Sequence, residues 1–261
     1  MKQAILDILN GGKNWQLWAP LAWRDTRLRY TRTVIGPFWQ TLSMSIFICT
    51  LGVLYSKFWN LDVALFLPYL AVGMSAWVLV STVLIEACGV FHTSAAIILQ
   101  KRLPYSTFVF QLLLRNLIVF LHNLPVALLV LLLFEFEFNA NLLFLIPGLT
   151  IVLLNLFWLA ILLGLLCTRF RDIANLVTSL IQIVFFVTPI FWNADLIQGK
   201  HRLFFVDSNP MFHMIEMIRG PLLGYPPPML SWWVNMGILI IGIFITMQIY
   251  QRFRSRIPYW L

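Results

Sequence analysis

Hydrophobic and charged positions follow one another along this chain in long blocks rather than in short periods. Six windows hold no charged residue and are each close to membrane-spanning length: residues 33–56, 63–85, 116–134, 138–168, 173–194 and 220–251. About 20 residues of helix cross the ~30 Å hydrocarbon core of a bilayer. A chain inside that core must satisfy its backbone groups internally. The pattern therefore predicts an all-α integral membrane protein with six transmembrane helices.

The expected spans are about 33–56, 64–87, 106–134, 142–167, 173–193 and 231–251. Together they form one transmembrane domain, residues 33–252. An amphipathic interface segment, residues 1–32, precedes this domain, and a short cytoplasmic tail, residues 253–261, follows it.

The basic residues between the windows are divided unequally between the two sides of the membrane. If the first window begins in the cytoplasm, most of the 18 Lys and Arg residues fall inside: Lys2, Lys13, Arg24, Arg27, Arg29, Arg32, Lys101, Arg102, Arg169, Arg171, Arg252, Arg254 and Arg256. Lys57, Lys200, Arg202 and Arg219 fall outside, and Arg115 lies within the expected third span. This bias is typical of cytoplasmic loops. It predicts that both termini are cytoplasmic.

Composition excludes an ordinary soluble domain, because 61% of the residues are hydrophobic and only 11% are charged. The net charge of +8 would suit nucleic acid in a soluble protein. Here the basic residues lie at helix ends on one side, so we expect membrane lipids and a cytoplasmic protein as partners, and no nucleic acid. The cysteines Cys49, Cys88 and Cys167 lack metal-ligand spacing, and neither a disulfide framework nor a metal site is expected.

The N-terminal segment predicts a helix lying in the membrane interface. Asp7 interrupts the first apolar run, so no signal peptide is expected. After a break at Gly11-Gly12, Trp15 and Trp18 recur at helical spacing, while arginines crowd the end nearest the first span. Trp on one side and Arg on the other are typical of interfacial helices. Such a helix either anchors the first span or also contacts a soluble partner.

Two loops predict short helices of their own. Residues 91–106 contain a short amphipathic stretch that should end before Pro104. Between the last two spans, residues 209–224 are too charged to span but rich in apolar side chains, with a break at Gly220-Pro221. This segment predicts a re-entrant external helix half-sunk in the outer leaflet.

The sequence lacks a phosphate-binding loop, so any nucleotide must be bound by a separate chain. Within the expected spans, only Glu86 near the inner end of the second span and Arg115 in the third are charged. An unpaired charge at a helix centre costs ~2.5–3.5 kcal/mol. We therefore predict that the two side chains neutralise each other; the alternative is that Arg115 contacts an anionic substrate.

Two groups of polar side chains leave open the alternative that this protein is an enzyme. Glu135 and Glu137 on an external loop are similar to the acidic pair of metal-dependent, polyprenyl-linked glycosyltransferases. His201, Asp207, His213 and Glu216 could be arranged around a metal, although only His213 and Glu216 have ligand-like spacing.

Three stretches resemble the permease subunits of type-2 ABC exporters. The stretch RDTRLRYTRTVIGPFWQTL resembles the family's basic interface helix and the start of its first span, with Arg29, Tyr30, Gly36 and Trp39 at the family's positions. The stretch RFRDIANLVTSLIQIVFFVTPIFW resembles the fifth span. The stretch NPMFHMIEMIRGPLLG resembles the external element that follows it. The pattern is most similar to the branch that exports lipid-linked polysaccharides.

The resemblance implies a homodimer bound to two copies of a cytoplasmic ABC ATPase, in a bacterial cytoplasmic (inner) membrane. It implies no cofactor in this chain, with ATP and Mg on the ATPase. The implied ATPase contacts are Trp15, Arg24, Arg27, Arg29, Arg32, Gln100, Lys101, Arg102, Arg171 and Asp172. The implied outer gate consists of Thr188, Pro189, Asn209, Pro210, His213, Glu216 and Arg219.

These observations predict a transport subunit rather than an enzyme, which exports an undecaprenyl-diphosphate-linked polysaccharide of the O-antigen, capsule or teichoic-acid type. The alternatives are a type-2 exporter of another amphipathic substrate, or a polytopic glycosyltransferase that uses Glu135 and Glu137. Aromatic residues number 40 in all and would line a sugar path only in small part, since many serve as membrane-interface belts.

Overall fold

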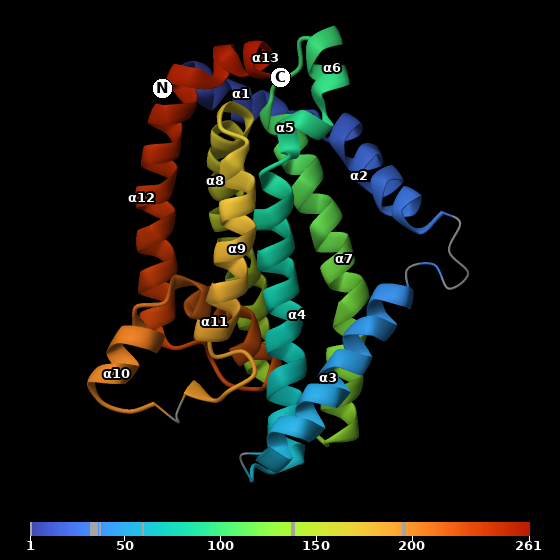
Figure 1. Ribbon diagram of the computed structural model, residues 1–261, viewed down its shortest axis with the longest axis vertical. Coiled ribbons are helices and arrows are strands. Elements are labelled where there is room, and N and C mark those ends of the chain that lie inside the picture. The colour runs from blue at the N-terminus through green and yellow to red at the C-terminus, as the bar shows by residue number, and fades with distance from the viewer. Residues whose placement is uncertain (1, 32–35, 37, 59, 137–138, 195–196) are drawn as a thin grey trace.

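The computed structural model describes residues 2–31, 36, 38–58, 60–136, 139–194 and 197–261. Every regular element in these ranges is a helix, as the sequence predicts. The long helices are α3 (Phe38–Phe58), α4 (Val63–Ala87), α7 (Ser106–Leu133), α8 (Leu145–Arg169) and α12 (Met229–Phe253). These five are long and apolar enough to cross a membrane. They run between two ends of a bundle (Figure 1), which we name the termini end, where both chain ends lie, and the opposite end.

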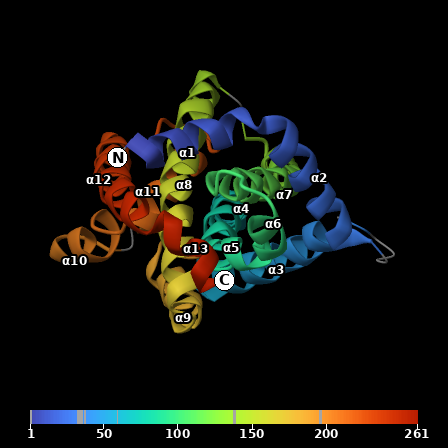
Figure 2. The ribbon, with the colours of Figure 1, turned by 90° about the horizontal axis from the view of Figure 1, so that it is seen from above.

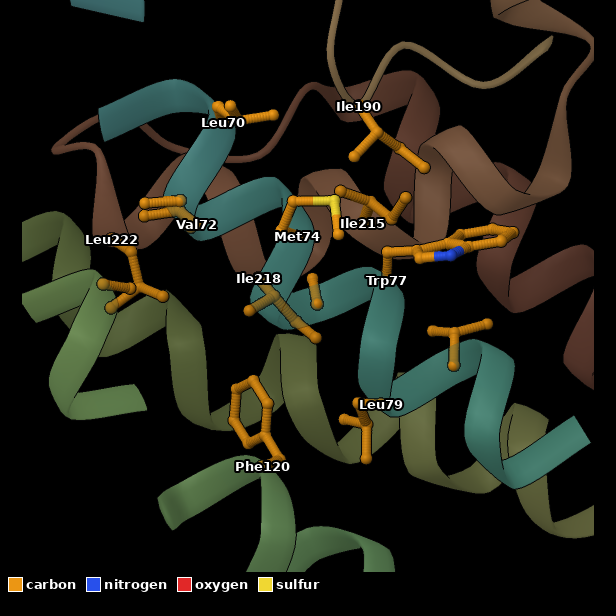
Figure 3. Packing of buried hydrophobic residues seen from close by; sticks show 14 of the residues in the cluster. Leu70, Val72, Met74, Trp77, Leu79, Phe120, Ile190, Ile215, Ile218 and Leu222 are labelled. Carbon is orange, nitrogen blue, oxygen red and sulfur yellow. The ribbon is translucent and has the colours of Figure 1, made fainter. Parts of the chain in front are cut away.

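The centre of the bundle is α4, which contacts α3, α7, α8, α9 and α11. A helix that is apolar on all faces is stable only when it is surrounded by other apolar groups, and α4 is the most buried of the five long helices. Its side chains Met74 and Leu79 pack with Phe120 of α7 and with Ile215 and Ile218 of α11 in the main core (Figure 3).

The fifth span is shorter than expected. The sequence predicts a helix over about 173–193, but α9 (Asp172–Val187) has only 16 residues and ends six residues earlier. Pro189 explains the early end, because a proline disfavours helical geometry in the residue before it, and Thr188 is extended at φ −81° and ψ 135°. No residue of α9 is buried within the single chain.

The N-terminal segment forms two helices, α1 (Lys2–Lys13) and α2 (Trp15–Tyr30), which lie along the rim of the termini end (Figure 2). The expected break at Gly11-Gly12 is wrong. Both glycines lie inside α1, and the change of direction comes at Asn14. Gly11 is needed there because a Cβ atom at this position would collide with the Ser106 side chain of α7. Close helix packing, rather than a chain break, accounts for that glycine.

The loop between α4 and α7 carries two short helices, α5 (Val90–Thr93) and α6 (Ala95–Gln100). The second ends before Pro104, as expected. The last residues form a short 3₁₀ helix η4 (Arg254–Arg256) and α13 (Ile257–Trp260). α13 contacts both α6 and α8, so the C-terminal segment covers the termini end of the bundle.

At the opposite end, a 3₁₀ helix η1 (Ala140–Phe144) precedes α8, and α10 (Lys200–Arg202) leads through a π-helix η3 (Leu203–Asp207) into α11 (Pro210–Leu222). α11 is not half-sunk at a lipid surface. All residues from Phe212 to Leu222 are buried, and the helix contacts α4, α8 and α12. The enclosure follows from Gly148 of α8, where a Cβ atom would collide with the backbone of Met217.

Candidate functional site

The residues expected to form an outer gate lie together at the opposite end, where they join the turn after α9 to α11. Asn209 caps α11, accepting from the Met211 N–H at 2.9 Å. Its Nδ2 also donates to Thr188 Oγ1 at 2.9 Å. Arg219 donates from Nη1 to the Pro189 carbonyl at 2.8 Å. We name Tyr69, Thr188, Pro189, Asn209, His213, Glu216 and Arg219 the closure cluster.

Arg219 is the central charge of the closure cluster and is completely buried. Its Nε donates to Glu216 Oε1 at 2.7 Å. Its guanidinium lies 4.1 Å from the ring centroid of Tyr69, which adds a cation–π contact. A buried charge is tolerated only when it is paired and hydrogen-bonded, and Arg219 meets both conditions. Tyr69 was missed by the sequence reasoning, because nothing in its window distinguishes it from a packing aromatic.

His213 and Glu216 do not present free polar groups to a transport path in this structure. The His213 ring nitrogens lie 2.9 Å from Ser231 Oγ and 2.8 Å from the Asp207 carbonyl. Glu216 also accepts from the Tyr225 hydroxyl at 3.3 Å. Burial, and then the charge of Glu216, raise the pKa of Tyr225, so this phenol stays neutral and remains a donor. Both side chains are buried and hydrogen-bonded within the chain, as residues that stabilise a closed gate would be.

The remaining residue of the expected gate, and the other side chains considered for an enzyme or metal site, lie outside the closure cluster at the opposite end. Pro210 is exposed at the start of α11. Glu135 is exposed with φ 56°, and Glu137 lies outside the described residues. His201 is exposed, and Asp207 lies 3.8 Å from Arg202. Within the described ranges, no three His, Cys, Asp or Glu side chains come together as metal ligands would.

Toward the termini end, Glu86 and Arg115 form the ion pair that the sequence predicts. Arg115 Nη2 lies 2.7 Å from Glu86 Oε2, which also accepts from the Asn116 amide at 2.7 Å. Arg115 Nη1 lies 3.6 Å from Asp25 of α2, and Gln111 donates to Asp25 at 2.6 Å. We name these five residues the polar network. It joins the interface helix to α4 and α7, and Asp25, Gln111 and Asn116 are the members that sequence reasoning missed.

The polar network borders a pocket of about 400 Å³ between α2, α7 and the α5–α6 loop. Arg24, Thr93 and Ser94 complete its polar lining. Arg115 is held between two carboxylates, so its charge is already compensated by the protein. This arrangement favours neutralisation over the alternative in which Arg115 contacts an anionic substrate.

The expected ATPase contacts are exposed side chains of α2, α6 and the α8–α9 turn. Those that the structure describes are Trp15, Arg24, Arg27, Gln100, Lys101, Arg102, Arg171 and Asp172. Arg29 lies near the end of α2, but its side chain and the whole of Arg32 lie outside the described residues. The exposed groups come from three separate parts of the chain. The middle part, at the end of α6, is held on the bundle because α5 contacts α7 and α6 contacts α13.

An aromatic groove runs between α4 and α9. It has a volume of about 330 Å³ and includes Trp77, Phe185 and Phe186, together with the polar groups of Ser81 and Gln182. Trp77 and Phe185 lie 5.5 Å apart between ring centroids. Trp77 is buried on α4, whereas Phe185 and Phe186 lie on α9 and Phe186 is exposed in the single chain.

Comparison with known proteins places this architecture in a family. The profile of the "ABC-2 type transporter" family matches residues 16–223, from α2 to the end of α11. Two Klebsiella pneumoniae proteins, each named "O-antigen export system permease protein RfbA", are similar to this chain along 249 residues, at 22% and 20% identity. Each match covers 94% of this chain and 96% of the relative. The chain is therefore a multi-pass membrane permease that belongs to the ABC-2 type transporter family.

Proposed function

We propose that this chain is the permease subunit of an ATP-driven exporter of an undecaprenyl-diphosphate-linked polysaccharide, of the O-antigen, capsule or teichoic-acid type. The observation that carries the proposal is the extent of the similarity to two O-antigen export permeases, which runs along 94% of the chain. That extent includes the interface helix α2, the loop with α5 and α6, and the enclosed helix α11.

In this proposal the termini end faces the cytoplasm and binds two copies of an ABC ATPase, which carry ATP and Mg. The basic bias of the termini end supports this orientation. Exposed Arg24 and Arg27 on α2 and Lys101 and Arg102 after α6 offer charges to a soluble partner. The polar network then links that surface to α4 and α7 through Asp25 and Arg115.

A second copy of the chain would complete the transport path. α9 has no buried residue, so its apolar surface is free to contact lipid or a second copy. The aromatic groove beside it offers rings on which the apolar faces of sugars can stack. The closure cluster would be the outer gate, because it ties the turn after α9 to the enclosed α11.

The test begins with the chain and an ABC ATPase that co-purifies with it, reconstituted together in vesicles with a lipid-linked polysaccharide. The permease alone should neither bind nor hydrolyse ATP, since it lacks a phosphate-binding loop. The complex should move the polymer across the membrane in an ATP-dependent manner. Arg27→Glu should reduce ATPase assembly or transport while membrane insertion is unchanged, with Lys200→Glu at the opposite end as the matched control.

Three results would contradict the proposal in different ways. ATP-dependent movement of a different amphipathic lipid would keep the exporter and change its substrate. Sugar transfer that depends on Glu135 would favour the glycosyltransferase. Transport that is unchanged in Arg27→Glu would remove α2 from the coupling surface.

A further inference from the structure

Asp7, which in the sequence merely interrupts an apolar run, is a buried carboxylate with four donors. Its side chain is 1% exposed. It accepts from the backbone N–H groups of Tyr105 at 3.2 Å and Ser106 at 3.1 Å. It also accepts from the Tyr250 hydroxyl at 2.8 Å and lies 3.3 Å from Arg254 Nη2. A buried carboxylate without such partners would be strongly unfavourable. The four donors therefore stabilise the Asp7 carboxylate in this buried position.

Asp7 acts as the N-cap of α7, although it lies about a hundred residues earlier in the chain. The first N–H groups of a helix lack partners within the helix, and Tyr105 at the N-cap position offers no capping side chain of its own. The Asp7 carboxylate fills this role and places a negative charge at the positive end of the helix dipole. In return, Ser106 Oγ donates to the Asp7 carbonyl at 2.8 Å.

α1, the helix that carries Asp7, is also attached to the end of α12. The Ala4 N–H at the start of α1 donates to Gln251 Oε1 at 2.8 Å. Arg254 Nη1 donates to the Gln3 carbonyl at 2.6 Å. α1 therefore connects the first turn of α7 to the last turn of α12, and Asp7 is the point where the two connections meet.

This junction lies where the α5–α6 loop enters α7. The loop continues through Pro104 directly into Tyr105, so Asp7 holds its downstream end. We propose that Asp7 is a positioning residue for energy coupling, which makes the loop, α7 and α12 move as one unit when the ATPase contacts the loop. The proposal rests on the proposed function. Without the cap, movement of the loop would fray the first turn of α7 instead of displacing the helix.

The test uses Asp7→Asn in the full permease–ATPase complex. Asparagine keeps the shape and one acceptor oxygen but loses the charge that faces Arg254. Amide exchange at residues 105–108 should rise about fivefold, because the NH2 group that replaces one carboxylate oxygen cannot accept the hydrogen bonds of that oxygen. ATP hydrolysis per assembled complex should persist, while the amount of substrate moved per ATP should fall severalfold. Asp62→Asn is the matched control, because Asp62 caps α4 at the opposite end by accepting from the Ala64 N–H at 2.9 Å.

A merely structural role would lower hydrolysis and transport in parallel with the amount of assembled complex. The ratio of transport to hydrolysis therefore decides the proposal, and an unchanged ratio in Asp7→Asn would overturn it. Should that variant fail to assemble, Tyr250→Phe, which removes one donor, must show a smaller shift of the same ratio, and an unchanged ratio there overturns the proposal as well. If the unaltered complex does not transport, the proposed function fails, and amide exchange in Asp7→Asn still tests the cap.

Discussion

Charged side chains in the apolar parts of this protein are tied to specific partners, some on the same helix and some on remote parts of the chain. Arg219 meets Glu216, the Pro189 carbonyl and the Tyr69 ring. Arg115 lies between Glu86 and Asp25. Because removal of one partner leaves the other charge buried, the unpaired partner dominates the cost of a substitution.

The prediction at the residue scale concerns Arg219. Arg219→Ala should lower the free energy of unfolding by about 3–5 kcal/mol, because it leaves Glu216 buried without a counter-charge. Unfolding in mixed micelles with increasing SDS, followed by tryptophan fluorescence, measures this loss. Lys200→Ala, on an exposed residue, is the control.

Removing both charges separates pairing from packing. The double variant Glu216→Leu, Arg219→Met should recover much of the lost stability, since neither charge then remains buried. A single variant as stable as the Lys200→Ala control would show that water reaches Glu216.

At the scale of single elements, helix lengths and glycine contacts shape the opposite end. α9 ends at Val187 because of Pro189, and the chain then returns through α10 and η3 into α11. α11 can lie inside the bundle because Gly148 lets the backbones of α8 and α11 approach closely. Gly73 of α4 similarly leaves room for Arg219, whose Nη1 would lie 3.3 Å from a Cβ atom at that position.

The prediction for this element compares two glycines in long apolar helices. Gly148→Ala should destabilise the protein by about 1–3 kcal/mol, the usual cost of forcing extra atoms into a packed interior. Gly237→Ala should be neutral or slightly stabilising, because nothing lies within 4 Å of a Cβ atom there and alanine favours helix. Thermal unfolding of the detergent-solubilised protein measures both. Equal melting temperatures would mean that α11 moves aside at little cost.

At the scale of the whole molecule, both termini lie at one end of the bundle, and η1, α10 and α11 lie at the other (Figure 1). This arrangement agrees with an even number of membrane crossings, in which the 16-residue α9 counts as one. The distribution of Lys and Arg predicts that the termini end faces the cytoplasm.

The corresponding prediction is a labelling pattern. In a variant in which the three native cysteines are replaced by serine, single cysteines at positions 57, 135 and 200 should react with a membrane-impermeant maleimide in intact cells. A cysteine at position 101 should react only after permeabilisation. The reverse pattern at positions 101 and 200 would invert the orientation, and equal labelling of both would contradict six crossings.

Several features of this protein follow from its sequence alone. Long apolar windows must become helices in a bilayer because the backbone has no other way to satisfy its polar groups. The pairing of Glu86 with Arg115 was predictable for a related reason, since two lone charges at similar depth are stable only together. Pro104 also marks the expected limit of a local helix, whereas the expected break at Gly220-Pro221 is wrong, because both residues lie inside α11.

Other features were decided only by the tertiary structure. Asp7, Asp25 and Tyr69 have no local signal, because their partners lie on helices that are remote in sequence and come close only after folding. Gly11 looks like a chain break in the sequence but permits contact between α1 and α7. The enclosure of α11 depends on Gly148 in another helix. A sequence pattern reports what each segment needs from its surroundings, whereas the partner that meets this need is chosen by the packing of the whole chain.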